Sequence, residues 1–273
     1  MIEGNHRINQ CLDGGVVDES LRDARHDFVN IVSKKFSYGD HGPTIVSVVC
    51  QSCGVTLRAT LFDMDGLLID SEVLWHKAEL EILGRLGVLL PETGDRSTKG
   101  MYVSDVVDYW FERFPWSGPD RDDVVNLLLE RVGDLVDEEG QLMPGVLQAL
   151  DRTSARGPIA LASSTPLSLI YRCLDRFDLR SRFQSVHSAE LEPYGKPHPG
   201  VFLTAASSLG VAPADCLVVE DSAAGVLAAK AGSMTVVAVP TKEDRWQPAF
   251  ALADLVLNSL EELSSEWLDL QFA

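Results

Sequence analysis

Residues 57–72 read LRATLFDMDGLLIDSE, and this stretch decides the fold. An apolar run over residues 57–62 is followed at once by two carboxylates, Asp63 and Asp65, and then by the turn residue Gly66. Short apolar runs of this kind, ended by turn residues, are typical of buried strands. Because ligands of open parallel sheets bind beyond the carboxyl ends of the strands, we expect the two carboxylates to lie in a binding site.

Short β-rich runs alternate with helical patterns along the rest of the chain, which predicts a parallel sheet with helical crossovers. The expected strands cover residues 57–62, 158–162, 184–187, 216–219, 234–239 and 254–257. The expected helices between them cover residues 166–177, 199–209 and 223–231. The predicted fold class is α/β, with a Rossmann-like parallel-sheet core into which a small α-helical domain is inserted.

A long helical interval separates the first expected strand from the second. A crossover between parallel strands needs only about a dozen residues, so this interval is too long to be one connection. The predicted boundaries are residues 71–142 for the helical domain and residues 57–70 with 143–273 for the α/β core. We place the hinge between them near residues 70–71 and 143–145.

Residues 1–56 have mixed polarity and a turn cluster at 39–43, and they predict a flexible N-terminal extension. Only residues 21–31 hint at a short amphipathic helix. Cys50 and Cys53 have the spacing of half a zinc site or of a redox pair, but no second cysteine pair follows them.

The charge balance disfavours several kinds of partner. The chain has 23 Lys and Arg against 41 Asp and Glu, a net charge of −18 that repels nucleic acid and anionic lipid. Its apolar runs are far shorter than the roughly 20 residues of a membrane span. The first residues lack the apolar core of a signal peptide, and the five cysteines are too sparse for a disulfide framework. We therefore expect a cytoplasmic monomer with no nucleic-acid or membrane partner.

Polar side chains also follow the later expected strands. Ser163 and Ser164 follow the second, Glu220 and Asp221 follow the fourth, and Lys196 lies in the loop before the helix at 199–209. Carboxylates crowded at one sheet edge repel one another unless a cation lies between them, and oxygen ligands without nearby His or Cys suit Mg²⁺. A lysine, hydroxyls and helix-start N–H groups would supply the positive side of a phosphate site.

In this order and at these strand ends, the segments resemble the four signature motifs of the haloacid dehalogenase superfamily. The resemblance rests on residues 63–72, Ser163, residues 196–199 and residues 220–225, and it extends from residue 57 to about residue 263. Within the superfamily the chain is similar to the β-phosphoglucomutase-like phosphatases with a helical cap. Trp75 and the segments 114–119 and 193–199 extend the similarity to bacterial phosphatases of hexitol phosphates and of 2-deoxyglucose 6-phosphate.

The resemblance implies a mechanism. Asp63 would attack phosphorus to form an aspartyl-phosphate, and Asp65 would protonate the leaving sugar oxygen and then take a proton from water. Mg²⁺ would be held by Asp63, the main-chain carbonyl of Asp65 and Asp221, with Glu220 supporting. Ser163, Ser164 and Lys196 would bind the phosphate of a small phosphorylated sugar or sugar alcohol. Five residues are expected to read the sugar from the cap side: Glu72, Trp75, His76, Lys99 and Met101.

Several alternatives stay open at this point. The two aspartates could be ordinary turn residues, Glu220 could be a second-layer partner or a helix N-terminal charge, and Trp75 could pack in the helical domain. A sugar-phosphate mutase would share Asp63 and Asp65. A non-catalytic sensor of a phosphorylated metabolite would also bind there, whereas dehalogenation needs neither Asp65 nor a magnesium cluster.

Overall fold

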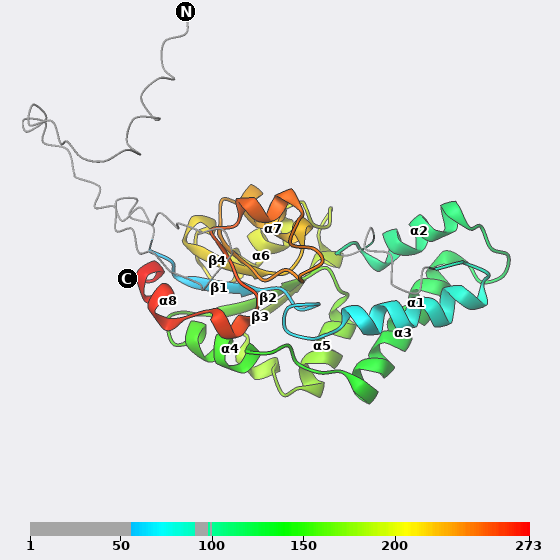
Figure 1. Cartoon of the computed structure of the whole chain (residues 1–273), viewed down its shortest axis with the longest axis horizontal. Coiled ribbons are helices and arrows are strands. Elements are labelled where there is room, and N and C mark those ends of the chain that lie inside the picture. Colours follow the sequence, from blue (N-terminus) through cyan, green and yellow to red (C-terminus); the bar gives the residue numbers. More distant parts are fainter. Residues whose placement is uncertain (1–55, 91–97, 99) are drawn as a thin grey trace, which may run out of the picture. The chain divides into compact units, whose positions relative to one another are not determined.

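The computed structural model describes residues 56–90, 98 and 100–273 (Figure 1). The expectations for the N-terminal extension, for the helix at 21–31, for Cys50 and Cys53 and for Lys99 lie outside these residues. None of the helices in the described part of the chain combines the length and the apolar character that a membrane crossing requires.

The core of the described chain is a six-stranded parallel sheet with the order β3-β2-β1-β4-β5-β6. Its strands are β1 (Ala59–Phe62), β2 (Ile159–Ser163), β3 (Ser185–Ser188), β4 (Cys216–Glu220), β5 (Thr235–Ala238) and β6 (Leu255–Val256). All six begin and end within two residues of the expected bounds. The predicted α/β class and parallel topology are therefore confirmed.

Helices cover both faces of the sheet (Figure 1). One face carries α6 (Gly200–Ser208) and α7 (Ala223–Ala231), and the other carries α4 (Val146–Ser154), α5 (Leu167–Arg176) and α8 (Ser265–Gln271). Side chains of β1 alternate between them: Ala59 and Leu61 pack with α6 and α7, and Phe62 packs on the opposite side. This double burial explains why the strands read as nearly continuous apolar runs.

The strand order reverses beside β1. The chain moves from β1 to β2 and β3 on one side and then crosses over to β4 on the other. The Asp63 N–H donates to the Val219 carbonyl (3.1 Å), so the end of β1 is tied to β4 where the order reverses. A reversal of this kind leaves a crevice at the carboxyl ends of the strands, and Asp63 is the first residue to enter it.

Three helices are inserted between β1 and α4: α1 (Glu72–Arg85), α2 (Val103–Arg113) and α3 (Arg121–Glu139). Leu74, Ala78 and Leu83 of α1 are buried, as are Val124 and Leu128 of α3, at the helical spacing expected of amphipathic helices that pack together. Asp120 caps α3 by accepting a hydrogen bond from the Asp123 N–H (2.8 Å).

The chain leaves the core and returns to it along two adjacent segments. The Asp70 N–H donates to the Gln141 carbonyl (2.9 Å), and the Met143 N–H donates to the Leu68 carbonyl (2.9 Å). These are the segments in which the hinge is predicted. A second contact joins the helices to the core, since Arg172 of α5 forms ion pairs with residues Asp134 and Asp137 of α3.

Candidate active site

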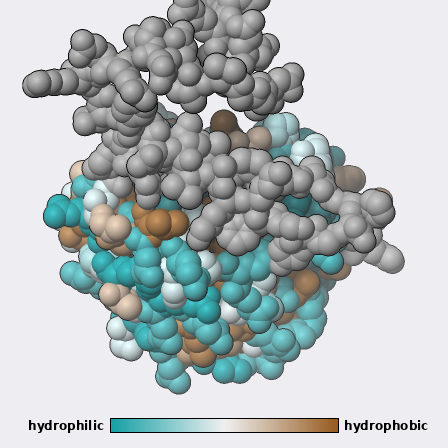
Figure 2. All heavy atoms as spheres, turned by 60° about the vertical axis from the view of Figure 1, so that its left-hand side comes forward, coloured by the Kyte–Doolittle hydropathy of each residue, from teal (hydrophilic) through white to brown (hydrophobic). Residues whose placement is uncertain are grey.

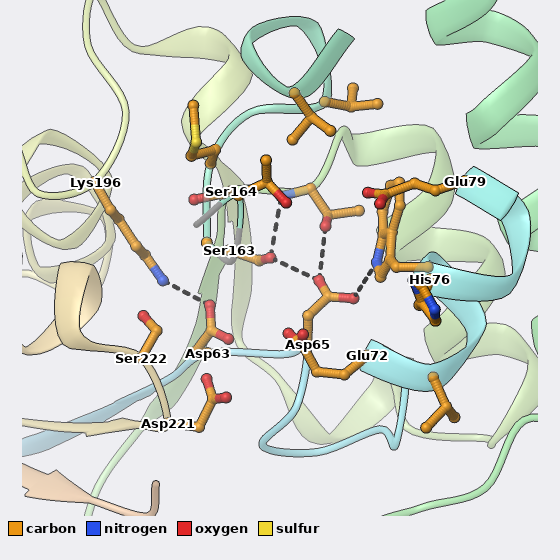
Figure 3. Close-up of a pocket in the computed structure, with 18 of the residues that line it drawn as sticks. Asp63, Asp65, Glu72, His76, Glu79, Ser163, Ser164, Lys196, Asp221 and Ser222 are labelled. Carbon is orange, nitrogen blue, oxygen red and sulfur yellow. Dashed lines mark hydrogen bonds and ion pairs between the residues drawn. The ribbon is translucent and has the colours of Figure 1, made fainter. Parts of the chain in front are cut away.

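A cavity of about 260 Å³ opens between the carboxyl edge of the sheet and helix α1 (Figure 3). Ligand pockets usually measure about 300–1,000 Å³, so this one is sized for a small molecule. Every expected site residue that the structure describes lines it: Asp63, Asp65, Glu72, Trp75, His76, Met101, Ser163, Ser164, Lys196, Glu220 and Asp221. The structure therefore brings together side chains that are up to 158 positions apart in the sequence, from Asp63 to Asp221.

Lys196 lies at the centre of the polar cluster. Its ammonium donates hydrogen bonds to Asp63 Oδ1 (2.6 Å), Glu220 Oε1 (2.7 Å) and the Ala162 carbonyl (3.2 Å). Only 2% of the Lys196 side chain is exposed, and the side chains of Asp63 and Glu220 are 8% and 0% exposed. A buried charge is stable only when it is paired and hydrogen-bonded, and here all three protons of the ammonium have an acceptor.

Glu220 is fixed by the start of helix α7. Its Oε2 accepts hydrogen bonds from the Asp221 N–H and the Ser222 N–H (2.8 Å each) and from the Ser222 hydroxyl (3.0 Å). A Cβ at Gly225 would lie 1.7 Å from Glu220 Oε1, so only glycine leaves room for this carboxylate. Both oxygens of Glu220 are thus engaged within the protein, Oε1 by Lys196 and Oε2 by these three donors.

Asp63, Glu220 and Asp221 form an acidic cluster. Each offers a carboxylate oxygen within 4.8 Å of the others, and all three residues are buried. Burial raises the pKa of Asp63 well above its usual value, and the charges of Glu220, Asp221 and Asp65 raise it further, while Lys196 opposes the shift. Burial lowers the pKa of Lys196, but Asp63 and Glu220 outweigh this effect and the net shift is upward.

One lysine therefore faces three buried carboxylates, and a further cation would favour the ionised form of Asp63. A set of carboxylate oxygens without His or Cys is the donor set of Mg²⁺. Gly66 follows the two aspartates and has φ = +73°. It leaves the space beside Asp221 free of a side chain, because a Cβ at this position would lie 2.4 Å from Asp221 Oδ2. The residues present thus fit a divalent cation.

Asp65 is held by four side-chain donors. Its Oδ1 accepts hydrogen bonds from the Ser71 hydroxyl (2.7 Å) and the Trp75 indole N–H (3.0 Å), and its Oδ2 accepts from the hydroxyls of Thr165 (2.6 Å) and Ser163 (3.3 Å). Figure 3 shows Asp65 beside Ser163 in the cavity, on the side of α1. Its carboxylate is thereby connected both to the sheet edge and to the inserted helices.

Sequence reasoning missed Thr165 and Ser71 as partners of Asp65. Thr165 comes directly after Ser163 and Ser164, so a further hydroxyl just past the end of β2 was the available signal. Trp75 was expected either to contact the sugar or to pack within the helical domain. In the structure it packs against the core cluster and lines the cavity, and it also donates to Asp65.

Two serines face the position expected for a phosphate. Ser163 accepts a hydrogen bond from the Thr165 N–H (3.1 Å), which fixes the turn after β2. The Ser164 hydroxyl is buried on the wall of the cavity and has no hydrogen-bond partner in the described chain. Because a buried polar group without a partner is costly, Ser164 is suited to a polar ligand.

Helix α1 contributes several residues to the cap-side wall of the cavity. Glu72 packs beside Gly66, since its Cγ would lie 3.4 Å from a Cβ placed on that glycine. His76 and Met101 also line the cavity, together with Glu79 and Thr98, which sequence reasoning did not single out. Glu79 follows Glu72 by seven residues, two helical turns, and this spacing is the signal that was available.

Fold and site together define a class of protein: an α/β domain with inserted helices and a buried lysine–carboxylate cluster at the switch point of its sheet. The sequence profile of the haloacid dehalogenase-like hydrolases matches residues 57–232. A relative, hexitol phosphatase B of Escherichia coli K12, is 44% identical over 212 residues, which cover 77% of this chain and 96% of the relative. The chain belongs to the haloacid dehalogenase-like hydrolases.

Solved structures share this fold. A β-phosphoglucomutase from Clostridium difficile superposes with a TM-score of 0.70 at 24% identity, covering 80% of this chain and 97% of that protein. A variant of CbbY from Rhodobacter sphaeroides, solved in complex with xylulose 1,5-bisphosphate, superposes with a TM-score of 0.69 at 26% identity, covering 77% and 97%. Both have the fold described above.

Proposed function

We propose that this chain is a Mg²⁺-dependent phosphomonoesterase that hydrolyses small sugar phosphates, of the hexitol phosphate or 2-deoxyglucose 6-phosphate type. The observation that carries the proposal is the convergence of Asp63, Lys196 and Asp221 on one cavity of about 260 Å³. The similarity to a hexitol phosphatase over most of the chain supports this choice of substrate.

Asp63 is the nucleophile in this proposal. Lys196 holds one of its oxygens (2.6 Å) and so fixes the carboxylate at the end of β1. A carboxylate oxygen of Asp63 forms a bond to phosphorus as the bond from phosphorus to the sugar oxygen breaks, which leaves an aspartyl-phosphate. Lys196, the Ser163 hydroxyl and the Ser164 N–H stabilise the charge on the phosphoryl oxygens.

Asp65 is the general acid and then the general base in this proposal. It protonates the sugar oxygen as that group leaves, and it then takes a proton from the water that attacks the aspartyl-phosphate. The second step releases inorganic phosphate and restores Asp63 and Asp65 to their starting forms. The hydrogen bonds from Ser71, Trp75 and Thr165 keep the Asp65 carboxylate in position for both transfers.

Residues of the sheet edge would hold the cation. Asp63, the main-chain carbonyl of Asp65 and Asp221 would hold Mg²⁺, with Glu220 supporting through Lys196 and the start of α7. When bound, it supplies positive charge that screens the repulsion between Asp63 and the substrate phosphate.

The helical domain, residues 71–142 in this proposal, closes over the bound substrate and excludes bulk water. The paired segments around residues 70 and 143 are suited to be its hinge, because only two short stretches of chain join the parts there. We further propose that the protein acts as a cytoplasmic monomer without nucleic-acid partners, in line with its net charge of −18.

Phosphate release from a panel of sugar phosphates tests the proposal. With Mg²⁺, hexitol phosphates and 2-deoxyglucose 6-phosphate should release inorganic phosphate, and EDTA should abolish the release because Asp63 and Asp221 then lack their cation. Isomerised sugar phosphate without free phosphate would identify a mutase instead. Tight binding of these compounds without any turnover would identify a sensor and would contradict the proposal.

A further inference from the structure

Tyr102 connects the inserted helices to the α/β core. It is the N-cap residue of α2, where its carbonyl accepts a hydrogen bond from the Val106 N–H (3.0 Å). Its hydroxyl donates to the main-chain carbonyl of Ala189, the first residue after β3. Burial raises the pKa of this hydroxyl, and nearby acidic charges add to the shift, so it stays protonated and can donate. One side chain thus ties α2 to the core.

The ring of Tyr102 lies against the loop that carries Lys196. A Cβ added to Gly195 would lie 2.5 Å from the Tyr102 ring, so a side chain at this position would displace the ring. Gly195 directly precedes Lys196, whose ammonium holds Asp63 (2.6 Å). Tyr102 therefore contacts this loop twice, at its start after β3 and next to the phosphate-site lysine.

The Tyr102 contact and the hinge lie on opposite faces of the sheet. Tyr102 packs against the buried cluster beneath α6 and α7, to which Ala189 belongs. Leu68 and Ile69, just before the hinge, are buried in the cluster of the other face, and Met143 packs against that same cluster. The helical domain is thus joined to the core through contacts on both faces.

The cavity lies between these two contacts. Glu72 follows the hinge directly and lines the cavity, and so do Met101 and Val103, which flank Tyr102 in the sequence. Tyr102 itself is not part of the lining. If the helical domain opens about the hinge, the hinge segments can keep their hydrogen bonds, but Tyr102 has to leave the core. Its two neighbours then move away from the sheet edge with it.

We infer that Tyr102 is a positioning residue whose contacts with Ala189 and Gly195 hold the helical domain closed over the bound substrate. This inference rests on the proposed function, in which closure excludes bulk water. Because Tyr102 does not line the cavity, it acts through the fraction of the bound complex that is closed. Loss of its contacts lowers that fraction. While the closed form still dominates the bound complex, the loss raises KM and leaves kcat nearly unchanged.

The first test compares Tyr102→Phe with the wild type in phosphate release from a hexitol 6-phosphate with Mg²⁺. Phenylalanine keeps the ring against Gly195 but removes the hydrogen bond to Ala189. One hydrogen bond changes an equilibrium constant by about 3–10-fold, so KM should rise by that factor. The kcat should stay within about 2-fold of the wild type. A merely structural role would lower the folded fraction instead, which lowers the apparent kcat and leaves KM unchanged.

Gly195→Ala should act on the same contact from the other side. Its methyl group should displace the Tyr102 ring and raise KM by about 10-fold. In the Tyr102→Ala background the methyl group has room, so the same substitution should change KM by less than about 2-fold. Additive effects of the two substitutions would show that ring and glycine are not coupled and would contradict the inference.

Amide hydrogen exchange measures the contact without turnover. In Tyr102→Phe, peptides that cover residues 100–106 and 189–195 should exchange about 3–10-fold faster than in the wild type. Peptides that cover the hinge segment at residues 141–146 should exchange as in the wild type, because the hinge keeps its own hydrogen bonds.

Arg172→Gln is the matched control. It weakens the contact of α5 with Asp134 and Asp137 of α3, which also joins the helical domain to the core, but on the face of the hinge. In this variant KM and the exchange of residues 189–195 should stay at the wild-type values.

The outcomes separate this inference from the proposed function. An unchanged KM or unchanged exchange in Tyr102→Phe, with normal turnover by the wild type, would overturn this inference alone. A lower kcat at constant KM would assign Tyr102 a structural role, and an equal rise of KM in Arg172→Gln would assign the effect to general loosening; either result would also overturn it. No phosphate release by the wild type would overturn the proposed function and this inference with it.

Discussion

The sheet edge and helix α1 form two walls of one cavity, but they hold their side chains in different ways. At the sheet edge, Asp63, Lys196 and Glu220 are at most 9% exposed and are linked by bonds of 2.6–2.7 Å. On α1, Glu72 and His76 are only partly buried. A closed network suits chemistry that requires fixed geometry, and a more open wall suits substrate recognition.

The largest expected effect lies at the sheet edge. Asp63→Asn keeps the size of the side chain but removes the nucleophile, so phosphate release should fall by roughly 10⁴-fold or more. The measurement is steady-state phosphate release with Mg²⁺, and circular dichroism controls for folding. A variant that retained activity within about 10-fold of the wild type would show that Asp63 is not the nucleophile.

Removal of the buried ammonium should affect both activity and stability. Lys196→Met leaves Asp63 and Glu220 buried without their shared partner, which should lower kcat/KM by about 10²–10³-fold. It should also lower the free energy of unfolding by about 3–5 kcal/mol, measured by urea titration in EDTA. Lys230→Met is the control, because Lys230 and its partner Asp254 are 30% and 44% exposed and their pair should contribute about 1 kcal/mol or less. Equal losses in the two variants would contradict the proposed network.

A smaller effect is expected where the two walls meet at Asp65. Trp75→Phe removes the indole donor at 3.0 Å, and Thr165→Val removes the hydroxyl donor at 2.6 Å. Each should lower kcat by about 10-fold, because Asp65 keeps its remaining donors. Trp116→Phe is the control, since the Trp116 indole donates to the Pro119 carbonyl (3.2 Å) within the helical domain. If all three variants behaved alike, the contacts to Asp65 would have no special role.

The smallest expected effect concerns the thiol of Cys216, which should not react in the native protein. Burial raises the pKa of the Cys216 thiol to about 12, and Asp215 adds to the shift, so the thiolate is scarce at pH 8. Iodoacetamide should leave Cys216 unmodified in the native protein and modify it after urea unfolding, as read by peptide mass spectrometry. Rapid modification of Cys216 in the native protein would show that the sheet opens readily. The sheet edge could then no longer be described as more closed than the wall formed by α1.

Much of the fold follows from local pattern. The six strands were expected within two residues of their bounds. The four inner ones, β1, β2, β4 and β5, are almost fully buried and therefore read as short apolar runs. Asp63 and Asp221 could be placed together for a related reason, since the carboxyl ends of parallel strands must meet at one edge. Lys196 lies in a loop, and the resemblance of its segment to a known motif is what pointed to it.

The site residues that sequence reasoning missed depend on tertiary contacts. Thr165 and Ser71 matter through their hydrogen bonds to Asp65, and no sequence spacing predicts those bonds. Glu79 looks like any solvated helix residue until the packing of α1 shows it to be buried on the cavity wall. The site residues at the sheet edge can thus largely be predicted from the sequence, whereas those on the α1 wall of the cavity cannot.

The most direct test of the account is to identify the residue that carries the phosphoryl group during turnover. Wild-type protein is mixed with a hexitol phosphate and Mg²⁺, quenched in acid within milliseconds, digested and analysed by mass spectrometry. The account predicts one added phosphoryl group on the peptide that contains Asp63, and none in Asp63→Asn. A phosphoryl group on another residue, or hydrolysis without any phosphorylated peptide, would contradict it.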